Sequence, residues 1–185
     1  MLTSSLTTTG CGDSESSAGN SGGSAGTAGT AGTAGTAGTT GETPENVAGD
    51  YTVALTSANN TCPTMAEDWM DGAMTEGVDF LIEQQGVTLS AETMGSPALY
   101  FLLLLGGNEF TGEIHGAHFV LTNHGSKQHT YETCNYTIDA VVEGDLEGDS
   151  IVGTLTYTPV VTPSDTCDSY ECAAEYTFTG VRPPR

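Results

Sequence analysis

The sequence predicts an all-β domain: an antiparallel up-and-down meander closed into a small barrel of eight or nine strands. One short helix and a disordered N-terminal tether complete the prediction. Turn residues recur at the short intervals typical of sandwiches and barrels. The segments between them are rich in Val, Ile, Thr, Tyr and Phe. Residues 12–48 contain no aromatic residue and only one large aliphatic, Val47, so they lack the apolar surface that a core needs.

Alternation of apolar and polar residues supports the strand assignments. Tyr51, Val53 and Leu55 should share one face, and Tyr176, Phe178 and Gly180 another. The run from Leu99 to Leu105 does not alternate, so we expect a strand buried on both faces, followed by a tight hairpin at Gly106-Gly107-Asn108. The predicted strands are 50–57, 78–84, 87–93, 98–105, 109–115, 117–123, 130–142, 150–159 and 172–182.

Two stretches share one pattern, in which a polar residue, a glycine and an acid precede an aliphatic, a second glycine and a strand. They are FTGEIHGAHFVLT, which starts at Phe110, and LEGDSIVGTLTYT, which starts at Leu146. Each predicts a hairpin, and repeated hairpins build a meander.

The segment Met65–Met74 is predicted to be the short helix. Thr64 and Glu67 form a capping-box pattern before it, and Gly72 would end it. Its methionines and Trp69 are either ordinary core residues or part of a helix that covers one end of the barrel.

The chain divides into three predicted regions. Residues 1–11 resemble the end of a signal segment, residues 12–48 form the tether, and residues 49–185 form the barrel domain. Within the tether, Ala-Gly-Thr repeats five times over residues 25–39. Glycine at every third position, without proline, predicts a flexible coil or a threonine-rich, O-glycosylated stalk.

Charge excludes one class of partner. The chain has 24 acids and three bases, and its formal net charge is −21. Such a chain repels phosphate backbones, so we expect no binding to nucleic acid. The acids keep the domain soluble, as in a salty habitat, or provide a surface for cations or cationic partners.

The cysteines predict an oxidising compartment. Four of them lie in the domain, which suits two disulfides better than a zinc site because no second close pair of ligands exists. The preferred pairing joins Cys167 to Cys172 and Cys62 to Cys134. The alternative joins Cys62 to Cys172, since the first and last strands of a closed barrel are neighbours, and Cys134 to Cys167.

The N-terminal segment SLTTTGC, followed by a Ser/Gly-rich stretch, resembles the lipobox of bacterial lipoproteins. Gly10 and Cys11 match that pattern, whereas Thr8 stands where the family usually has leucine. The resemblance implies lipidation of Cys11, export, and an outer-membrane or cell-surface location, with a soluble secreted or periplasmic protein as the alternative. Only ten residues precede Cys11, without the basic and apolar regions of a signal peptide, so we expect the coding region to begin further upstream.

The domain is similar in pattern to the lipocalin-like barrels of bacterial lipoproteins. The similarity lies in the opening GDYTV, the meander, and the closing aromatic strand that ends in Arg182. It implies a ligand cavity or a binding surface. The candidate cavity residues are Trp69, Phe80, Tyr100, Phe119 and Tyr157.

Two polar clusters are weaker candidates. His115, His118, His124 and His129 lie close together, and imidazoles bind Zn or Cu, but a spacing of three places His115 and His118 on opposite faces of a strand. The alternating acids Glu143, Asp145, Glu147 and Asp149 offer oxygen ligands for Ca²⁺ or form a solvated hairpin.

The sequence contains no GxSxG, HExxH or phosphate-cradling motif, so we expect neither an enzyme nor a cofactor. It predicts a lipid-anchored barrel that binds a small apolar molecule or a protein partner. The alternatives are a structural or adhesive knob on a stalk and a metal- or Ca²⁺-dependent surface module. An open interior would favour binding, and a filled interior would favour the knob.

Overall fold

The computed structural model describes residues 42–62, 72–131, 134–161 and 172–183. The predictions for residues 1–41 lie outside this part of the chain, and so does nearly all of the predicted helix at 65–74. Residues 42–48 belong to the domain, because Val47 is fully buried and Glu45 N donates to Gly116 O. The tether predicted for residues 12–48 therefore ends earlier than expected.

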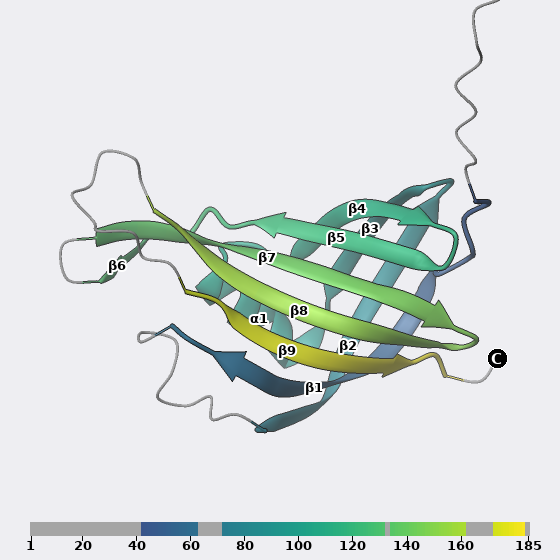
Figure 1. The fold of residues 1–185 in the computed structure, drawn as a ribbon, viewed down its shortest axis with the longest axis horizontal. Helices are drawn as coiled ribbons and strands as arrows, with labels where there is room; N and C mark the ends of the chain where they lie inside the picture. Colours follow the sequence, from purple (N-terminus) through teal and green to yellow (C-terminus); the bar gives the residue numbers. More distant parts are fainter. Residues whose placement is uncertain (1–41, 63–71, 132–133, 162–171, 184–185) are drawn as a thin grey trace, which may run out of the picture. The chain divides into compact units, whose positions relative to one another are not determined.

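The described residues form nine strands and one helix (Figure 1). In chain order they are β1 (Gly49–Asn60), β2 (Met74–Gln85), β3 (Thr88–Thr93), α1 (Gly95–Leu104), β4 (Glu109–His115), β5 (His118–His124), β6 (His129–Tyr131), β7 (Cys134–Glu147), β8 (Ser150–Val161) and β9 (Ala174–Val181).

Eight of these strands close into an antiparallel barrel. Strands that follow one another along the chain are paired, except that β5 pairs with β7 and not with β6, and the pairing of β1 with β9 joins the first strand to the last. The three-residue β6 pairs with β7 beyond the point where β5 ends. The predicted up-and-down barrel is confirmed. The predicted strand 130–142 is two strands, β6 and β7.

Side chains alternate between the interior and the surface, as the sequence pattern predicted. Tyr51 and Val53 point into the core from β1, and Tyr176, Phe178 and Gly180 lie on the buried face of β9. In β7 the same alternation places Glu143, Asp145 and Glu147 on the exposed face. The core therefore fills the barrel with one face of every long strand.

Three hairpins gather at one end of the barrel, which we call the closed end (Figure 1). Each has a two-residue loop that begins with glycine at positive φ, a conformation that suits the twist of hairpin strands: Gly86-Val87, Gly116-Ala117 and Gly148-Asp149. The second and third are the two hairpins predicted from the repeated sequence pattern, and both are confirmed.

The prediction of a strand at 98–105 is wrong, because Gly95–Leu104 is the helix α1. A continuous apolar run without alternation fits either structure, and the start and stop residues decide. Pro97 stands in the first turn, where a missing N–H costs nothing, and Gly106 follows the last turn at a φ of +87°. Gly106-Gly107-Asn108 therefore ends a helix and does not form a hairpin.

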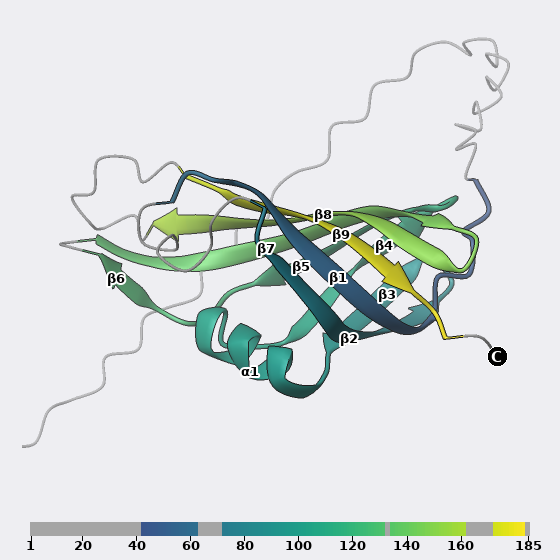
Figure 2. The same cartoon turned by 90° about the horizontal axis from the view of Figure 1, so that it is seen from below.

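The helix lies at the end of the barrel opposite to the three hairpins (Figure 2). We call this end, which holds the helix, the open end. Its Phe101 and the following Leu105 are buried, whereas Leu99 and Leu103 are about 60% exposed. The expectation that this run is buried on both sides is therefore wrong. Within the described residues, no helix has the length and apolar character needed to cross a membrane.

Both disulfides of the preferred prediction, Cys62–Cys134 and Cys167–Cys172, are also wrong. Cys62, just past β1, is bonded to Cys172, just before β9. The pairing of β1 with β9 brings these two positions together at the open end, as the alternative prediction assumed. Cys134 is disulfide-bonded as well. Cys167, in both predicted pairings, lies outside the described residues.

Candidate functional site

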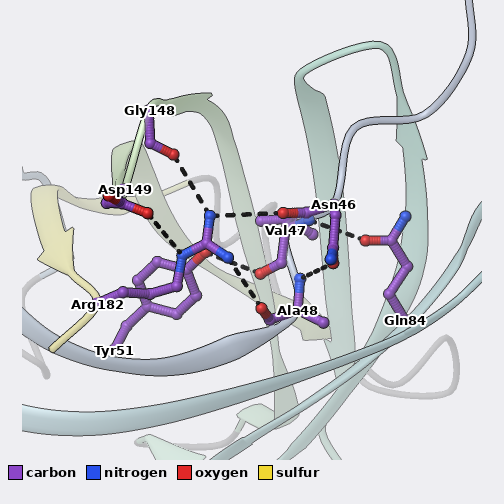
Figure 3. Close-up of polar contacts among 8 residues, drawn as sticks. All are labelled: Asn46, Val47, Ala48, Tyr51, Gln84, Gly148, Asp149 and Arg182. Atoms are coloured by element: carbon purple, nitrogen blue, oxygen red, sulfur yellow. Dashed lines mark hydrogen bonds and ion pairs between the residues drawn. The ribbon is translucent and has the colours of Figure 1, made fainter. Parts of the chain in front are cut away.

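The closed end is held by one arginine. The guanidinium of Arg182 donates from Nη1 to Ala48 O at 3.1 Å and from Nη2 to Gly148 O at 3.3 Å (Figure 3). It also lies 5.4 Å from the centroid of the Tyr51 ring. One cation thus joins the segment before β1, the β7–β8 turn and the end of β9.

A second set of hydrogen bonds fixes residues 45–48 against the strands. Tyr51 Oη donates to Val47 O at 2.8 Å, and Val47 N donates to Gln84 Oε1 at 2.9 Å. Burial raises the pKa of Tyr51, and the positive charge of Arg182 opposes that rise. The backbone of this segment is paired, and Val47 fills the interior beneath it.

The open end is organised around α1. The last carbonyls of the helix accept hydrogen bonds from the chain after β5. Ser126 N and Lys127 N both donate to Leu105 O, and His129 Nε2 lies 2.7 Å from Leu104 O. These contacts satisfy groups that a helix end leaves unpaired, and they hold the helix across this end of the barrel.

A cavity of about 400 Å³ lies between α1 and the strands at the open end. This volume falls in the range of small-molecule sites in proteins. We call it the outer cavity. Its walls combine aliphatic and aromatic side chains with hydroxyl groups: Leu55, Ser57, Ala73, Met74, Thr75, Val78, Pro97, Tyr100, Phe101, Leu155, Tyr157 and Tyr176.

A smaller cavity of about 40 Å³ adjoins the outer cavity deeper in the barrel, and we call it the inner cavity. The two share Leu55, Val78, Phe101 and Leu155 as walls. Every side chain around the inner cavity is apolar except that of Thr93. Thr93 is 1% exposed, and its Oγ1 has no hydrogen-bond partner among the described residues.

The tyrosines of the outer cavity are neutral over the physiological pH range. Burial raises the pKa of Tyr157 well above its usual value and that of Tyr100 likewise. Burial also raises the pKa of Tyr176 to about 12. The hydroxyls can therefore donate or accept hydrogen bonds, but they do not supply charge.

The predicted cavity residues divide into three groups. Tyr100 and Tyr157 line the outer cavity, and Phe80 lines the inner one. Phe119 is fully buried and lines neither, because its ring packs over Gly144 beside Phe178 in the filled interior. Trp69 lies outside the described residues.

Sequence reasoning missed most of the residues that form the cavities, among them Ser57, Thr93, Phe101 and Tyr176. The alternation predicted that Tyr176 shares a strand face with Phe178, and that signal could have identified it. Ser57, within β1, and Thr93, at the end of β3, are buried polar residues, and no spacing rule distinguishes them from exposed ones. Phe101 was hidden by the incorrect strand assignment.

The histidine and carboxylate clusters lie on the outside of the barrel. His115 and His118 face each other across the β4–β5 turn as a cross-strand pair, so the expectation that they lie on opposite faces is wrong. His118 contacts Asp145 at 3.1 Å and Glu143 at 3.4 Å, both on exposed strand positions. Among the described residues, no group of three or more His, Cys, Asp or Glu side chains could hold a metal ion.

We compared the chain with protein-family models, with curated proteins and with solved structures, and none of the three comparisons finds a match. The assignment of a function therefore depends on the geometry of the open end.

Proposed function

We propose that this domain is a binding module that takes a small molecule into the outer cavity. The observation that carries the proposal is the cavity of about 400 Å³ at the open end, walled by apolar side chains and tyrosine hydroxyls. Apolar walls provide most of the binding free energy of such sites, and a few placed polar groups orient the ligand. The proposed function is binding alone and involves no chemical reaction.

The rest of the barrel supplies rigidity. Large side chains fill the interior towards the closed end, where Phe119 and Phe178 meet over Gly144. Such packing favours a fixed pocket, since close-packed interiors yield little when a ligand enters. A filled barrel would suit the structural knob, which is the second candidate function, but the knob does not account for a cavity at one end.

A fluorescence titration tests the binding function. N-phenyl-1-naphthylamine, a neutral apolar dye, should bind saturably and gain fluorescence. Ala73→Trp places an indole at the mouth of the outer cavity, and we expect it to abolish most of that gain. Thr52→Trp adds the same bulk to an exposed position of β1 and should leave the titration unchanged. Absence of saturable binding, or equal binding by the Ala73→Trp variant, would favour the knob.

We further propose that the module is exported and held at a membrane by a lipid on Cys11. The support is the lipobox-like Gly10-Cys11 and the Cys62–Cys172 disulfide, which suits an oxidising compartment. A diacylglyceryl group supplies the two chains that stable anchoring needs.

Fractionation tests this anchor. With the natural upstream region in place, Cys11→Ala should move the protein from the membrane fraction to the soluble fraction. Ser16→Ala, a neighbouring change, should not. Retention of the Cys11→Ala variant in the membrane fraction would contradict the anchor and leave the binding function intact.

A further inference from the structure

Four aromatic rings form a connected wall of the outer cavity. Tyr100 and Phe101 stand edge to face with centroids 6.1 Å apart, and so do Tyr157 and Tyr176 at 5.9 Å. Phe101 and Tyr157 join the two pairs at 6.4 Å. Because edge-to-face neighbours present their planes in different directions, a ligand in this cavity meets ring surfaces from more than one side.

Among the described residues, none of those that line this cavity carries a charge. Of the three bases in the chain, Arg182 is engaged with carbonyl groups at the closed end, and Lys127 is not a wall residue. A carboxylate or phosphate inside the cavity would therefore be a buried, unpaired charge. A cation would instead be attracted by the negative faces of the rings.

The charge of the whole chain also favours a positively charged ligand. A net charge of −21 raises the local concentration of cations and repels anions.

From these observations we propose that the ligand of the outer cavity is an organic cation of the quaternary- or tertiary-ammonium class, recognised by aromatic faces. This inference rests on the proposed binding function and names its ligand class. An ammonium group that carries several methyl groups suits a cavity whose walls are both apolar and aromatic, because its charge is spread over carbon and costs less to dehydrate than a primary amine. The tyrosine hydroxyls remain available for an oxygen on the rest of the ligand.

A pair of isosteric probes tests the class. Choline and 3,3-dimethylbutan-1-ol have the same shape and differ in one atom, nitrogen or carbon, and therefore in charge. We expect choline to displace N-phenyl-1-naphthylamine from the wild-type protein at a concentration roughly tenfold lower than its neutral isostere. The advantage of choline should shrink as NaCl is raised. Equal or better displacement by the alcohol, or displacement of the dye by neither probe, would overturn the cation inference while the binding function stands. Failure of the dye itself to bind would overturn both.

Variants at Tyr100 separate ring recognition from cavity shape. Tyr100 is 37% exposed on α1, so its replacement leaves the core intact. Tyr100→Phe keeps the ring and should preserve the preference for choline over the alcohol. Tyr100→Leu removes the ring and should reduce that preference several-fold.

Leu99→Ala, next to Tyr100 but not a wall residue, is the matched control and should leave the preference unchanged. If Tyr100→Leu weakens both probes by the same factor, Tyr100 acts through shape alone and the inference is wrong.

Discussion

At the closed end, three two-residue turns and the segment 42–48 bring polar backbone groups together, and Arg182, Tyr51 and Gln84 pair them. At the open end, the connections are long, the helix α1 exposes leucines to solvent, and a cavity remains between the helix and the strands. The same set of strands forms the wall of the barrel at both ends. The difference therefore shows that in this barrel the connections decide which end has its backbone groups paired and which end keeps a cavity.

The two ends also use aromatic residues differently. Tyr51 at the closed end packs against a guanidinium and donates its hydroxyl to a carbonyl within the domain. Tyr100, Tyr157 and Tyr176 at the open end line the outer cavity. Four predictions test how far this division goes, from the largest expected effect to the smallest.

The open end should depend most on its disulfide. Cys62 and Cys172 are separated by 110 residues, so on the chain-entropy model their bond stabilises the fold by about 4–5 kcal/mol. The double variant Cys62→Ala/Cys172→Ala should lose about that much in urea-induced unfolding.

Thr61→Ala is the control, because it removes only the local hydrogen bonds between Thr61 and Ala173. It should lose about 1 kcal/mol. A double variant as stable as this control would mean that the open end does not need the disulfide.

The closed end should depend on Arg182. Its side chain is 13% exposed and makes charged hydrogen bonds to carbonyls, whereas its contact with Asp149 is long and that carboxylate is solvated. We expect Arg182→Ala to lower the free energy of unfolding by about 3 kcal/mol, with dye binding at the open end unchanged under folding conditions. Lys127→Ala removes the same charge from an exposed position and should change the free energy of unfolding little. Equal losses in the two variants would show that net charge, not the contacts, accounts for the effect.

Alkaline pH should weaken the domain through the open-end tyrosines. In the unfolded chain a tyrosine loses its proton near pH 10, whereas Tyr157 in the folded state keeps it to much higher pH. Unfolding therefore releases a proton above pH 10. The contribution of Tyr157 to the free energy of unfolding is fully present below pH 10 and is lost as the pH rises above it. By pH 11 the loss from this residue is about 1.4 kcal/mol.

Urea unfolding of the wild type and of Tyr157→Phe, compared at pH 9 and pH 11 and at constant ionic strength, measures this loss. The variant should lose about 1.4 kcal/mol less than the wild type over that interval. Parallel losses would indicate that the hydroxyl of Tyr157 reaches solvent in the folded state.

The smallest effect concerns Thr93. Its buried hydroxyl lines the inner cavity without a partner among the described residues, and an unpaired buried hydroxyl is costly. Thr93→Val, which keeps the shape, should stabilise the protein by about 1 kcal/mol. Thr111→Val, at an exposed position of β4, serves as the control for strand propensity. If Thr93→Val lowers the stability and Thr111→Val does not, the hydroxyl of Thr93 has a hydrogen-bond partner, such as a bound water.

The incorrect predictions fall mainly at the open end. Hairpins at the closed end follow local rules, because a two-residue turn needs glycine at a fixed position, and the repeated sequence pattern revealed two of them. The helix α1, the Cys62–Cys172 pairing and the cavity walls involve contacts between distant parts of the chain. The leucine run shows this clearly, since its composition fits a buried strand and only Pro97 and Gly106 favour a helix.

The sequence by itself determined that the domain is an antiparallel meander, that Tyr51 shares a strand face with Val53 and Tyr176 with Phe178, and that the chain is strongly acidic. These properties follow from period-two alternation, turn residues and net charge, which are local or additive. The tertiary structure decided which cysteines pair, that Phe119 packs in the core while Tyr176 lines a cavity, and that Arg182 holds residues 42–48 in place. Those outcomes depend on barrel closure, because the pairing of β1 with β9 brings residues more than a hundred positions apart into contact.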